Sequence, residues 1–283
     1  MASGIPVIRA ISDLRVQVRS WRERGDSVAL IPTMGALHEG HLQLVRLAKA
    51  RSVRAVVSIF VNPAQFAPHE DFERYPRDEA GDLVKLASVG CDAVWAPTLA
   101  QMYAEGFATR IVPAGAAEGL ESDFRPHFFG GVATVCCKLF TQVQPDVAVF
   151  GEKDYQQLMV VMQMVRDLDL PLQIVGAPTV READGLAMSS RNAYLSADER
   201  SIAPILNRVL LEVAAKVGSG GDIGETTGAA KAALTQAGFG KIDYVEVRDA
   251  ATLGPARPDA GRPLRVLAAV WLGKTRLIDN VGA

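Results

Sequence analysis

The sequence predicts an α/β fold in which a doubly wound parallel sheet is followed by a smaller C-terminal α+β domain. Short apolar runs, typical of buried parallel strands, alternate with longer segments whose apolar residues recur at helical spacing. Strands separated by helices form βαβ units, and such units build parallel sheets. The alternation ends near Ala177-Pro178-Thr179, so we expect domains at residues 1–177 and 178–283.

The elements of the first domain follow one another in this alternating order. Its strands are expected at residues 28–31, 54–61, 93–96, 147–150 and 172–177, with an edge strand at 109–112. Its helices are expected at residues 13–24, after His41, and at 78–89, 132–143 and 154–168. Asn62-Pro63 ends the second strand, because proline lacks the N–H of a sheet residue, and this places Gln65 in the loop beyond it.

The second domain opens with a helix signal. Ser196-Ala197-Asp198-Glu199 is a capping box, and we expect it to start a helix. The apolar residues on one side of this helix are Ile202, Ile205, Leu206, Val209 and Leu210. A second helix is expected at residues 225–237, a strand at 244–247, and a hairpin at 265–271 and 276–278. Leu272-Gly273-Lys274-Thr275 resembles the end of a P-loop, but Ala268 stands where its first glycine belongs. We therefore interpret this run as the hairpin turn.

Composition and charge limit the possible classes of function. The 283 residues are 49% hydrophobic and 22% charged, and the formal net charge is −2. This balance provides no basic surface for nucleic acid, and no run approaches the ~20 apolar residues of a membrane span. Residues 1–12 lack the apolar core of a signal peptide, and free thiols at Cys91, Cys136 and Cys137 suit a reducing compartment. We therefore expect a cytoplasmic protein.

One motif predicts nucleotide binding. Pro32-Thr33-Met34-Gly35-Ala36-Leu37-His38-Glu39-Gly40-His41 joins an expected strand to the helix after it, at the strand end where α/β sheets bind ligands. Glycines let the backbone approach a ligand closely, and a helix N-terminus favours phosphate. His38 and His41 lie three residues apart, so both imidazoles face one side and can donate hydrogen bonds to phosphate oxygens. An isolated H-x-G-H is about equally consistent with a turn that carries two surface histidines.

The longer run resembles the pantoate–β-alanine ligase family, within the H-x-G-H nucleotidylyltransferase superfamily. Further blocks match that family in the same order and cover most of the first two-thirds of the chain. They are Ser58-Ile59-Phe60-Val61-Asn62-Pro63-Ala64-Gln65-Phe66, Tyr75-Pro76-Arg77, Phe150-Gly151-Glu152-Lys153-Asp154-Tyr155-Gln156-Gln157-Leu158 and Asp184-Gly185-Leu186-Ala187-Met188-Ser189-Ser190-Arg191-Asn192. The last third is matched by length and pattern more than by motif. The resemblance implies a Rossmann-like sheet in the first domain and a lid in the second.

The resemblance also implies an activity and a set of site residues. The enzyme would join pantoate to β-alanine with ATP, through pantoyl adenylate, and release AMP and pyrophosphate. Catalytic roles would belong to His38, His41, Lys153 and Arg191, with His41 as the proton donor. ATP would be bound by Met34, Gly35, Ala36, Leu37, His38, Glu39, Gly40, His41, Gly151, Glu152, Lys153, Asp154, Val180, Met188, Ser189, Ser190 and Arg191. Gln65 and Gln157 would bind pantoate, and Gln65 would also bind β-alanine.

The resemblance further implies a homodimer, and it implies that Mg²⁺ arrives on the phosphates of ATP rather than at a metal site built by the protein. The residues agree on this last point, because His69 and His127 have no second ligand at a suitable spacing. The adjacent Cys136 and Cys137 likewise lack the spacing of a zinc site.

Several of these residues also have plain structural interpretations. Lys153 lies between two acidic residues, and on its own it would be a solvated lysine in a charged turn. Met188-Ser189-Ser190-Arg191 would be a polar turn between domains. The functional interpretations are a lysine that neutralises nucleotide phosphates, and a mobile clamp whose hydroxyls and guanidinium close over them.

Two other functions remain open at the level of sequence. Another H-x-G-H adenylyltransferase would transfer AMP to a phosphate substrate, although the neutral amides of Gln65 and Gln157 suit hydroxyls and a carboxylate better. A nucleotide-sensing module without catalysis would not need a second substrate pocket. The chain also departs from the family pattern within Arg125-Pro126-His127-Phe128, where the histidine is displaced by one position and Phe128 fills its place. The role of that family histidine is therefore not carried over.

Overall fold

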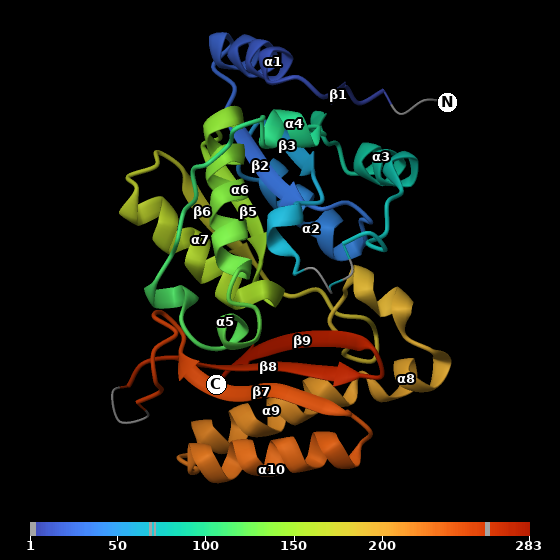
Figure 1. Cartoon of the computed structure of the whole chain (residues 1–283), viewed down its shortest axis with the longest axis vertical. Coiled ribbons are helices and arrows are strands. Elements are labelled where there is room, and N and C mark those ends of the chain that lie inside the picture. Colours follow the sequence, from blue (N-terminus) through green and yellow to red (C-terminus); the bar gives the residue numbers. More distant parts are fainter. Residues whose placement is uncertain (1–3, 68–69, 71, 258–260) are drawn as a thin grey trace. The chain divides into compact units, whose positions relative to one another are not determined.

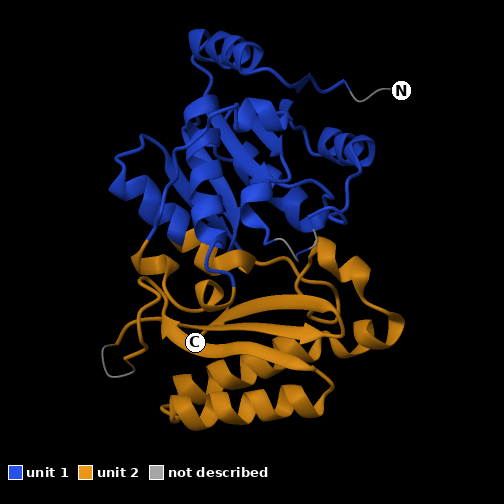
Figure 2. Cartoon of the chain, viewed as in Figure 1, with its two compact units in different colours: residues 1–113, 125–152, 160–178 blue, residues 114–124, 153–159, 179–283 orange. Residues whose placement is uncertain are grey.

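The computed structural model describes residues 4–67, 70, 72–257 and 261–283. Their contacts divide the chain into two compact units (Figure 2). The first unit consists of Met1–Pro113, Arg125–Glu152 and Val160–Pro178, and the second of Ala114–Phe124, Lys153–Met159 and Thr179–Ala283. Two short segments from the first 177 residues thus make their contacts within the second unit. The functional boundary expected after residue 177 stays a prediction.

A six-stranded sheet forms the centre of the first unit (Figure 1). Its strands, in the order β1-β4-β3-β2-β5-β6, are β1 (Val7–Ile8), β4 (Ala93–Trp95), β3 (Arg54–Ile59), β2 (Val28–Thr33), β5 (Val147–Gly151) and β6 (Gln173–Ala177). Every neighbouring pair is parallel. The direction of winding reverses between β2 and β5, and ligands of α/β proteins bind at such a switch point. The predicted doubly wound parallel sheet is confirmed.

Helices cover both faces of this sheet, which explains its continuous apolar strands. The helices are α1 (Ile11–Glu23), α2 (Glu39–Lys49), α3 (Glu79–Ser88), α4 (Leu99–Met102), α6 (Phe128–Val143) and most of α7 (Tyr155–Asp167). Successive strand residues point to opposite faces. Ala29 and Ile31 of β2 therefore join the core cluster that includes Val45 of α2, while α6 contacts β2 and α1. Residues Val28 to Ile31 of β2 are all fully buried.

The structure corrects two expectations for the first unit. The expected edge strand at 109–112 is wrong, since these residues form no regular structure. Instead, the Ile111 N–H donates to Thr134 Oγ1 of α6 at 3.0 Å. A side-chain oxygen thus accepts the backbone hydrogen bond that a carbonyl of a neighbouring strand would accept in a sheet. Conversely, β1 was missed, because two residues are too few to show a period.

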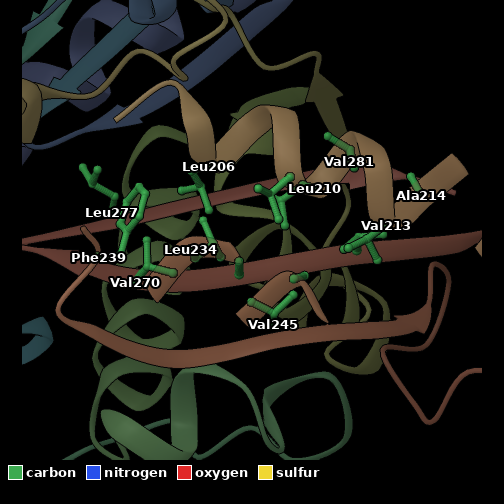
Figure 3. Packing of buried hydrophobic residues seen from close by; sticks show 14 of the residues in the cluster. Leu206, Leu210, Val213, Ala214, Leu234, Phe239, Val245, Val270, Leu277 and Val281 are labelled. Atoms are coloured by element: carbon green, nitrogen blue, oxygen red, sulfur yellow. The ribbon is translucent and has the colours of Figure 1, made fainter. Parts of the chain in front are cut away.

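The second unit is built on an antiparallel sheet of three strands in the order β7-β8-β9. Its elements are α5 (Glu121–Phe124), α8 (Ala197–Ile202), α9 (Ile205–Gly218), α10 (Ile223–Gln236), β7 (Lys241–Asp249), β8 (Leu264–Leu272) and β9 (Thr275–Gly282). Leu206 and Leu210 of α9 pack with Val245 and Val270 of the sheet and with Phe239 (Figure 3). Burying each such side chain contributes roughly 1.5–3 kcal/mol. The predicted α+β character of this part is confirmed.

In this unit, the predicted hairpin turn is confirmed, and the predicted single helix after Ser196 is wrong. The run at residues 272–275 is a hairpin turn rather than a P-loop, with Leu272 paired to Thr275 and Gly273 at φ +54°. The capping box at Ser196 and Glu199 is present, but the helix that follows ends at Ile202. Pro204 lacks a backbone N–H and precedes α9, so the expected single helix is divided into two. Among the described residues, no helix combines the length and apolar character that crossing a bilayer requires.

Candidate active site

The turn after β2 is held in an unusual backbone conformation. Gly35 has φ +84° and Ala36 has φ +51°, a region that a residue with a Cβ rarely adopts. Both backbone groups of Leu37 are bonded to α3: its N–H donates to Asp82 Oδ1 at 2.7 Å, and its carbonyl accepts from Lys85 Nζ at 2.8 Å. Helix α3, more than 40 residues further along the sequence, thus fixes the turn at which the motif predicts nucleotide binding.

Asp82 is the buried carboxyl in this arrangement. Its side chain is 1% exposed, and burial raises its pKa above the ordinary value despite the hydrogen bond from Leu37. Within the described part of the chain, Asp82 Oδ2 has no hydrogen-bond partner. This oxygen lies 3.2 Å from the position that a Cβ at residue 35 would occupy, which explains why residue 35 is a glycine. No sequence signal pointed to Asp82, because an Asp at this spacing from a Lys is common on helix surfaces.

A cavity of about 310 Å³ adjoins the same turn. It lies where β2, β3 and β4 end, and its lining includes Met34, Gly35, Phe60, Asp82 and Pro97. This is the edge of the sheet where the motif predicts ligand binding.

His38 and His41 lie together at the start of α2, with their ring centroids 4.1 Å apart. The His38 N–H donates to His41 Nδ1 at 3.3 Å, and the His41 N–H donates to the His38 carbonyl at 2.8 Å. Because Nδ1 accepts this hydrogen bond, Nε2 is the ring nitrogen with a proton to donate. The ring can therefore donate from Nε2 at a helix N-terminus, where the dipole already favours an anion.

Gln65 lies in the short 3₁₀ turn η1 (Pro63–Gln65) beyond β3, and its side chain is largely buried. Gly131 of α6 packs against this turn, and a Cβ on Gly131 would collide with the carbonyl of Ala64. Arg125 donates to the Gln65 carbonyl at 3.1 Å and forms two hydrogen bonds with Glu70. The turn that carries Gln65 is therefore fixed from two sides.

Phe128, which stands in the place of the family histidine, packs against Arg125. The Arg125 guanidinium lies 3.9 Å from the ring centroid of Phe128, a cation–π distance. Burial raises the pKa of the Glu70 carboxyl, but the hydrogen bond and charge of Arg125 more than offset this and leave it lowered. Phe128 therefore supports the Arg125–Glu70 pair. His127 is exposed, and His69 lies outside the described residues.

The predicted site residues of the second unit begin at Lys153. Its carbonyl accepts from Asn280 Nδ2 of β9 at 2.8 Å, and its Nζ lies 4.0 Å from Asp154 Oδ1. The adjacent glutamines differ: Gln156 is buried and donates to the carbonyls of Ala116 and Gly119, at 3.1 and 3.2 Å. Gln157 is half-buried, and no described residue is hydrogen-bonded to its side chain. Gln156 is thus structural, whereas Gln157 has an amide available for a ligand.

The segment from Val180 to Arg191 folds back on itself. The Met188 N–H donates to the Val180 carbonyl at 3.0 Å, which brings these two predicted ATP-binding residues together. Ser189 caps the 3₁₀ helix η4 (Ser190–Tyr194) by accepting from the Arg191 N–H at 3.3 Å. Arg181 forms two hydrogen bonds with Asp279 of β9, the neighbour of Asn280. Strand β9 thus anchors both the Lys153 turn and this segment.

The structure therefore groups the predicted residues in two sets, one in each unit. In the first unit, Met34 to His41 follow β2, Gln65 follows β3, and Gly151 and Glu152 lie at the end of β5; these three strands are adjacent in the sheet. Lys153, Asp154, Gln157, Val180 and Met188 to Arg191 belong to the second unit. Within the described residues, His, Cys, Asp and Glu side chains nowhere gather in threes as a metal site would require.

Comparison with known proteins decides the family. The model of the pantoate-beta-alanine ligase family matches residues 6–282. The chain belongs to the pantoate–β-alanine ligase family. It is a ligase that forms an amide bond between pantoate and β-alanine. The two other functions considered from the sequence, transfer of AMP to a phosphate substrate and nucleotide sensing without catalysis, are therefore excluded.

Relatives and solved structures support this family over nearly the whole chain. The pantothenate synthetase of Caulobacter vibrioides is 56% identical over 280 residues, which cover 97% of each chain. That of Mesorhizobium japonicum is 60% identical over 275 residues, or 97% of this chain and 96% of the relative.

Among solved structures, pantothenate synthetase from Thermus thermophilus matches with a TM-score of 0.90 at 45% identity, covering 98% of this chain and 99% of that one. The pantoate–β-alanine ligase of Francisella tularensis, solved in a complex with beta-gamma ATP and β-alanine, matches with a TM-score of 0.83 at 32% identity. The match covers 98% of this chain and 97% of that one.

Proposed function

We propose that this ligase uses ATP to activate pantoate before β-alanine reacts. The carboxylate oxygen of pantoate attacks the α-phosphorus of ATP, the bond from that phosphorus to its bridging oxygen breaks, and pyrophosphate leaves. The nitrogen of β-alanine then attacks the carbonyl carbon of pantoyl adenylate, AMP leaves with the bonding electrons, and the nitrogen loses a proton. Adenylation is needed because a free carboxylate has no good leaving group. Mg²⁺ reaches the site on the phosphates of ATP.

The observation that carries this proposal is the hydrogen bond that His41 Nδ1 accepts from the His38 N–H at the start of α2. A ring that donates from Nε2 can stabilise the negative charge that builds up on phosphate oxygens in the transition state. His41 lies in the first turn of α2, the helix that follows β2 at the switch point of the sheet, and the His38 ring lies against its ring. We assign adenylate formation to this pair, with His41 as the group that stabilises the departing pyrophosphate.

Lys153 and Arg191 would supply the positive charge that the triphosphate needs. Lys153 would neutralise phosphate oxygens, and Arg191 with the hydroxyls of Ser189 and Ser190 would hold the terminal phosphates. The free neutral amide of Gln157 suits the hydroxyls of pantoate, and Gln65 suits a carboxylate.

The three cysteines, Cys91, Cys136 and Cys137, are free thiols, which supports a location in a reducing compartment such as the cytoplasm. The proposal that the protein is a homodimer rests on the family resemblance alone.

An adenylate intermediate predicts an exchange reaction that does not need the amine. Without β-alanine, the enzyme is expected to exchange labelled pyrophosphate into ATP when pantoate is present. Gln157→Ala is expected to raise the pantoate concentration needed for half-maximal exchange by about 10-fold or more, because a buried polar group of the substrate loses its partner. Gln65→Ala is expected to raise it too, and also to raise the β-alanine requirement of the complete reaction.

The exposed Gln236 at the end of α10 provides the matched control, and Gln236→Ala is expected to leave both requirements unchanged. Exchange that strictly requires β-alanine would rule out a separate adenylate step and favour a concerted reaction of all three substrates.

Lys153 is expected to contact ATP in the ground state as well as in the transition state. Lys153→Ala should therefore weaken the binding of a non-hydrolysable ATP analogue by about 10-fold or more, besides lowering turnover, because one charge-assisted contact is lost. Titration calorimetry measures this affinity. Lys274→Ala, in the exposed hairpin turn, controls for the loss of a lysine charge and should bind as the wild type does. Unchanged affinity in the Lys153 variant would mean that its ammonium group makes no ground-state contact with the nucleotide.

A further inference from the structure

The amide of Gln65 is held in one of its two possible orientations. Asn62 Nδ2 donates to Gln65 Oε1 at 2.9 Å. Both side chains are buried, with residue exposures of 1% for Asn62 and 8% for Gln65. Among the described residues, none accepts a hydrogen bond from Gln65 Nε2. The acceptor end of this amide is thus occupied, while its donor end is available.

The orientation of Asn62 is itself determined by its surroundings. Its Oδ1 accepts from the hydroxyl of Tyr103 at 2.8 Å and from the Ala64 N–H at 3.2 Å, and its Nδ2 also donates to the Gly131 carbonyl at 3.2 Å. An amide has nearly the same shape when its oxygen and nitrogen are exchanged, so hydrogen-bond partners decide its orientation. Reversing Asn62 would turn its donor toward the Ala64 N–H and its acceptor toward the Gly131 carbonyl.

Tyr103 is well placed to hold this chain of amides. It follows α4, and its ring packs edge-on against Phe107, with centroids 5.1 Å apart, and lies near Phe60 at 6.2 Å. This packing fixes the ring independently of the hydroxyl. Burial raises the pKa of Tyr103 to about 12, so the hydroxyl keeps its proton at neutral pH.

We propose that Tyr103 is a positioning residue of the ligase reaction: through Asn62, it holds Gln65 with its NH₂ group presented to the carboxylate of pantoate. The proposal rests on the substrate-binding role proposed for Gln65, and it fixes the polarity of that contact. A carboxylate is the strongest acceptor on pantoate, and an NH₂ donor matches it, whereas the amide oxygen would repel it. Asn62 and Tyr103 therefore determine that this subsite accepts an anion.

The test compares Tyr103→Phe and Gln65→Ala, singly and combined, by calorimetric titration of pantoate in the presence of an ATP analogue whose α–β bridge cannot be cleaved. Tyr103→Phe keeps the packed ring and removes one hydrogen bond, so we expect pantoate affinity to fall about 3- to 10-fold. The affinity for the ATP analogue should not change. In the Gln65→Ala background, Tyr103→Phe should have no further effect, because the group that it positions is gone.

Asn62→Asp provides a second, larger change. An aspartate offers only acceptors to Gln65, so the Gln65 amide must reverse and present Oε1 to the substrate. We expect pantoate affinity to fall about 10- to 100-fold. Tyr244→Phe is the matched control, because it also removes a buried tyrosine hydroxyl, the one that donates to Glu121 in the second unit. It should leave pantoate affinity unchanged, and melting curves confirm that each variant is folded.

The outcomes separate the two proposals. If Gln65→Ala leaves pantoate affinity unchanged, the substrate-binding role of Gln65 is wrong and the positioning role falls with it. If Gln65→Ala weakens pantoate while Tyr103→Phe does not, only the role of Tyr103 is wrong. Equal effects of Tyr103→Phe with and without Gln65 would mean that Tyr103 acts on the fold generally, which also overturns the proposal.

Discussion

Replacing His41 with alanine is expected to lower the turnover of the ligase by about 10²- to 10³-fold while affinity for ATP changes little. The reason is that the Nε2 donor acts mainly on charge that develops as adenylate forms. Initial rates of pantothenate formation measure the turnover, and calorimetry with an ATP analogue measures the affinity. A variant that retains turnover within a few-fold of the wild type would remove His41 from the mechanism.

Two conservative variants separate the chemical role of His41 from its role in the helix start. Asparagine can still accept the His38 N–H, as Nδ1 does, but it does not reach the position of Nε2. Glutamine can place a donor nitrogen near that position, but it loses the acceptor. His41→Asn should therefore be as slow as His41→Ala, and His41→Gln should recover part of the rate. The reverse order would mean that His41 matters for the backbone of α2 rather than for the phosphate.

Replacing Arg276 with methionine is expected to destabilise the second unit by about 3–5 kcal/mol. The Arg276 side chain is 14% exposed and lies 2.7 Å from both Glu121 and Asp243, whose side chains are 7% and 2% exposed. Removing the guanidinium leaves two buried carboxylates without their main counter-charge. Urea unfolding followed by tryptophan fluorescence measures the effect. One of the three tryptophans, Trp271, lies in this cluster, because its Nε1 donates to Asp243 at 3.1 Å.

The control for this variant is Arg262→Met. Arg262 lies 3.7 Å from Asp249, but its side chain is 65% exposed, so solvent screens the pair and at most about 1 kcal/mol is expected. A loss in the Arg276 variant no larger than that of the control would show that Glu121 and Asp243 are stabilised without the arginine.

The sequence was informative wherever a signal lies within a few neighbouring residues. Val28 to Ile31 is apolar throughout because both faces of β2 are covered, so its strand and the turn after it were predictable. The spacing of His38 and His41 likewise predicted that their rings lie on one side. The hairpin at Gly273 followed from the same kind of local pattern.

The rest depends on contacts between segments that are distant in the sequence. Asp82 bonds Leu37 across 45 residues, and Tyr103 bonds Asn62 across 41 residues. Neither residue belongs to a motif, and each would be an ordinary helix or loop residue in another fold. The break at Pro204 is different, because a local signal was present and the apolar pattern outweighed it in our interpretation.

Gly131 has a consequence for how this enzyme tolerates mutation. Because a Cβ there would strike the Ala64 carbonyl, any other residue at position 131 displaces the turn that carries Gln65. Gly131 also accepts the hydrogen bond from Asn62, so the same displacement would disturb the amide chain. A saturation scan scored by growth without pantothenate would therefore find position 131 nearly as restricted as the reactive residues, although it has no side chain to offer. Second substitutions that restore growth to a Gly131 variant should cluster around residues 62–65. Position 131 and residues 62–65 are therefore expected to change together in evolution, although they are far apart in the sequence.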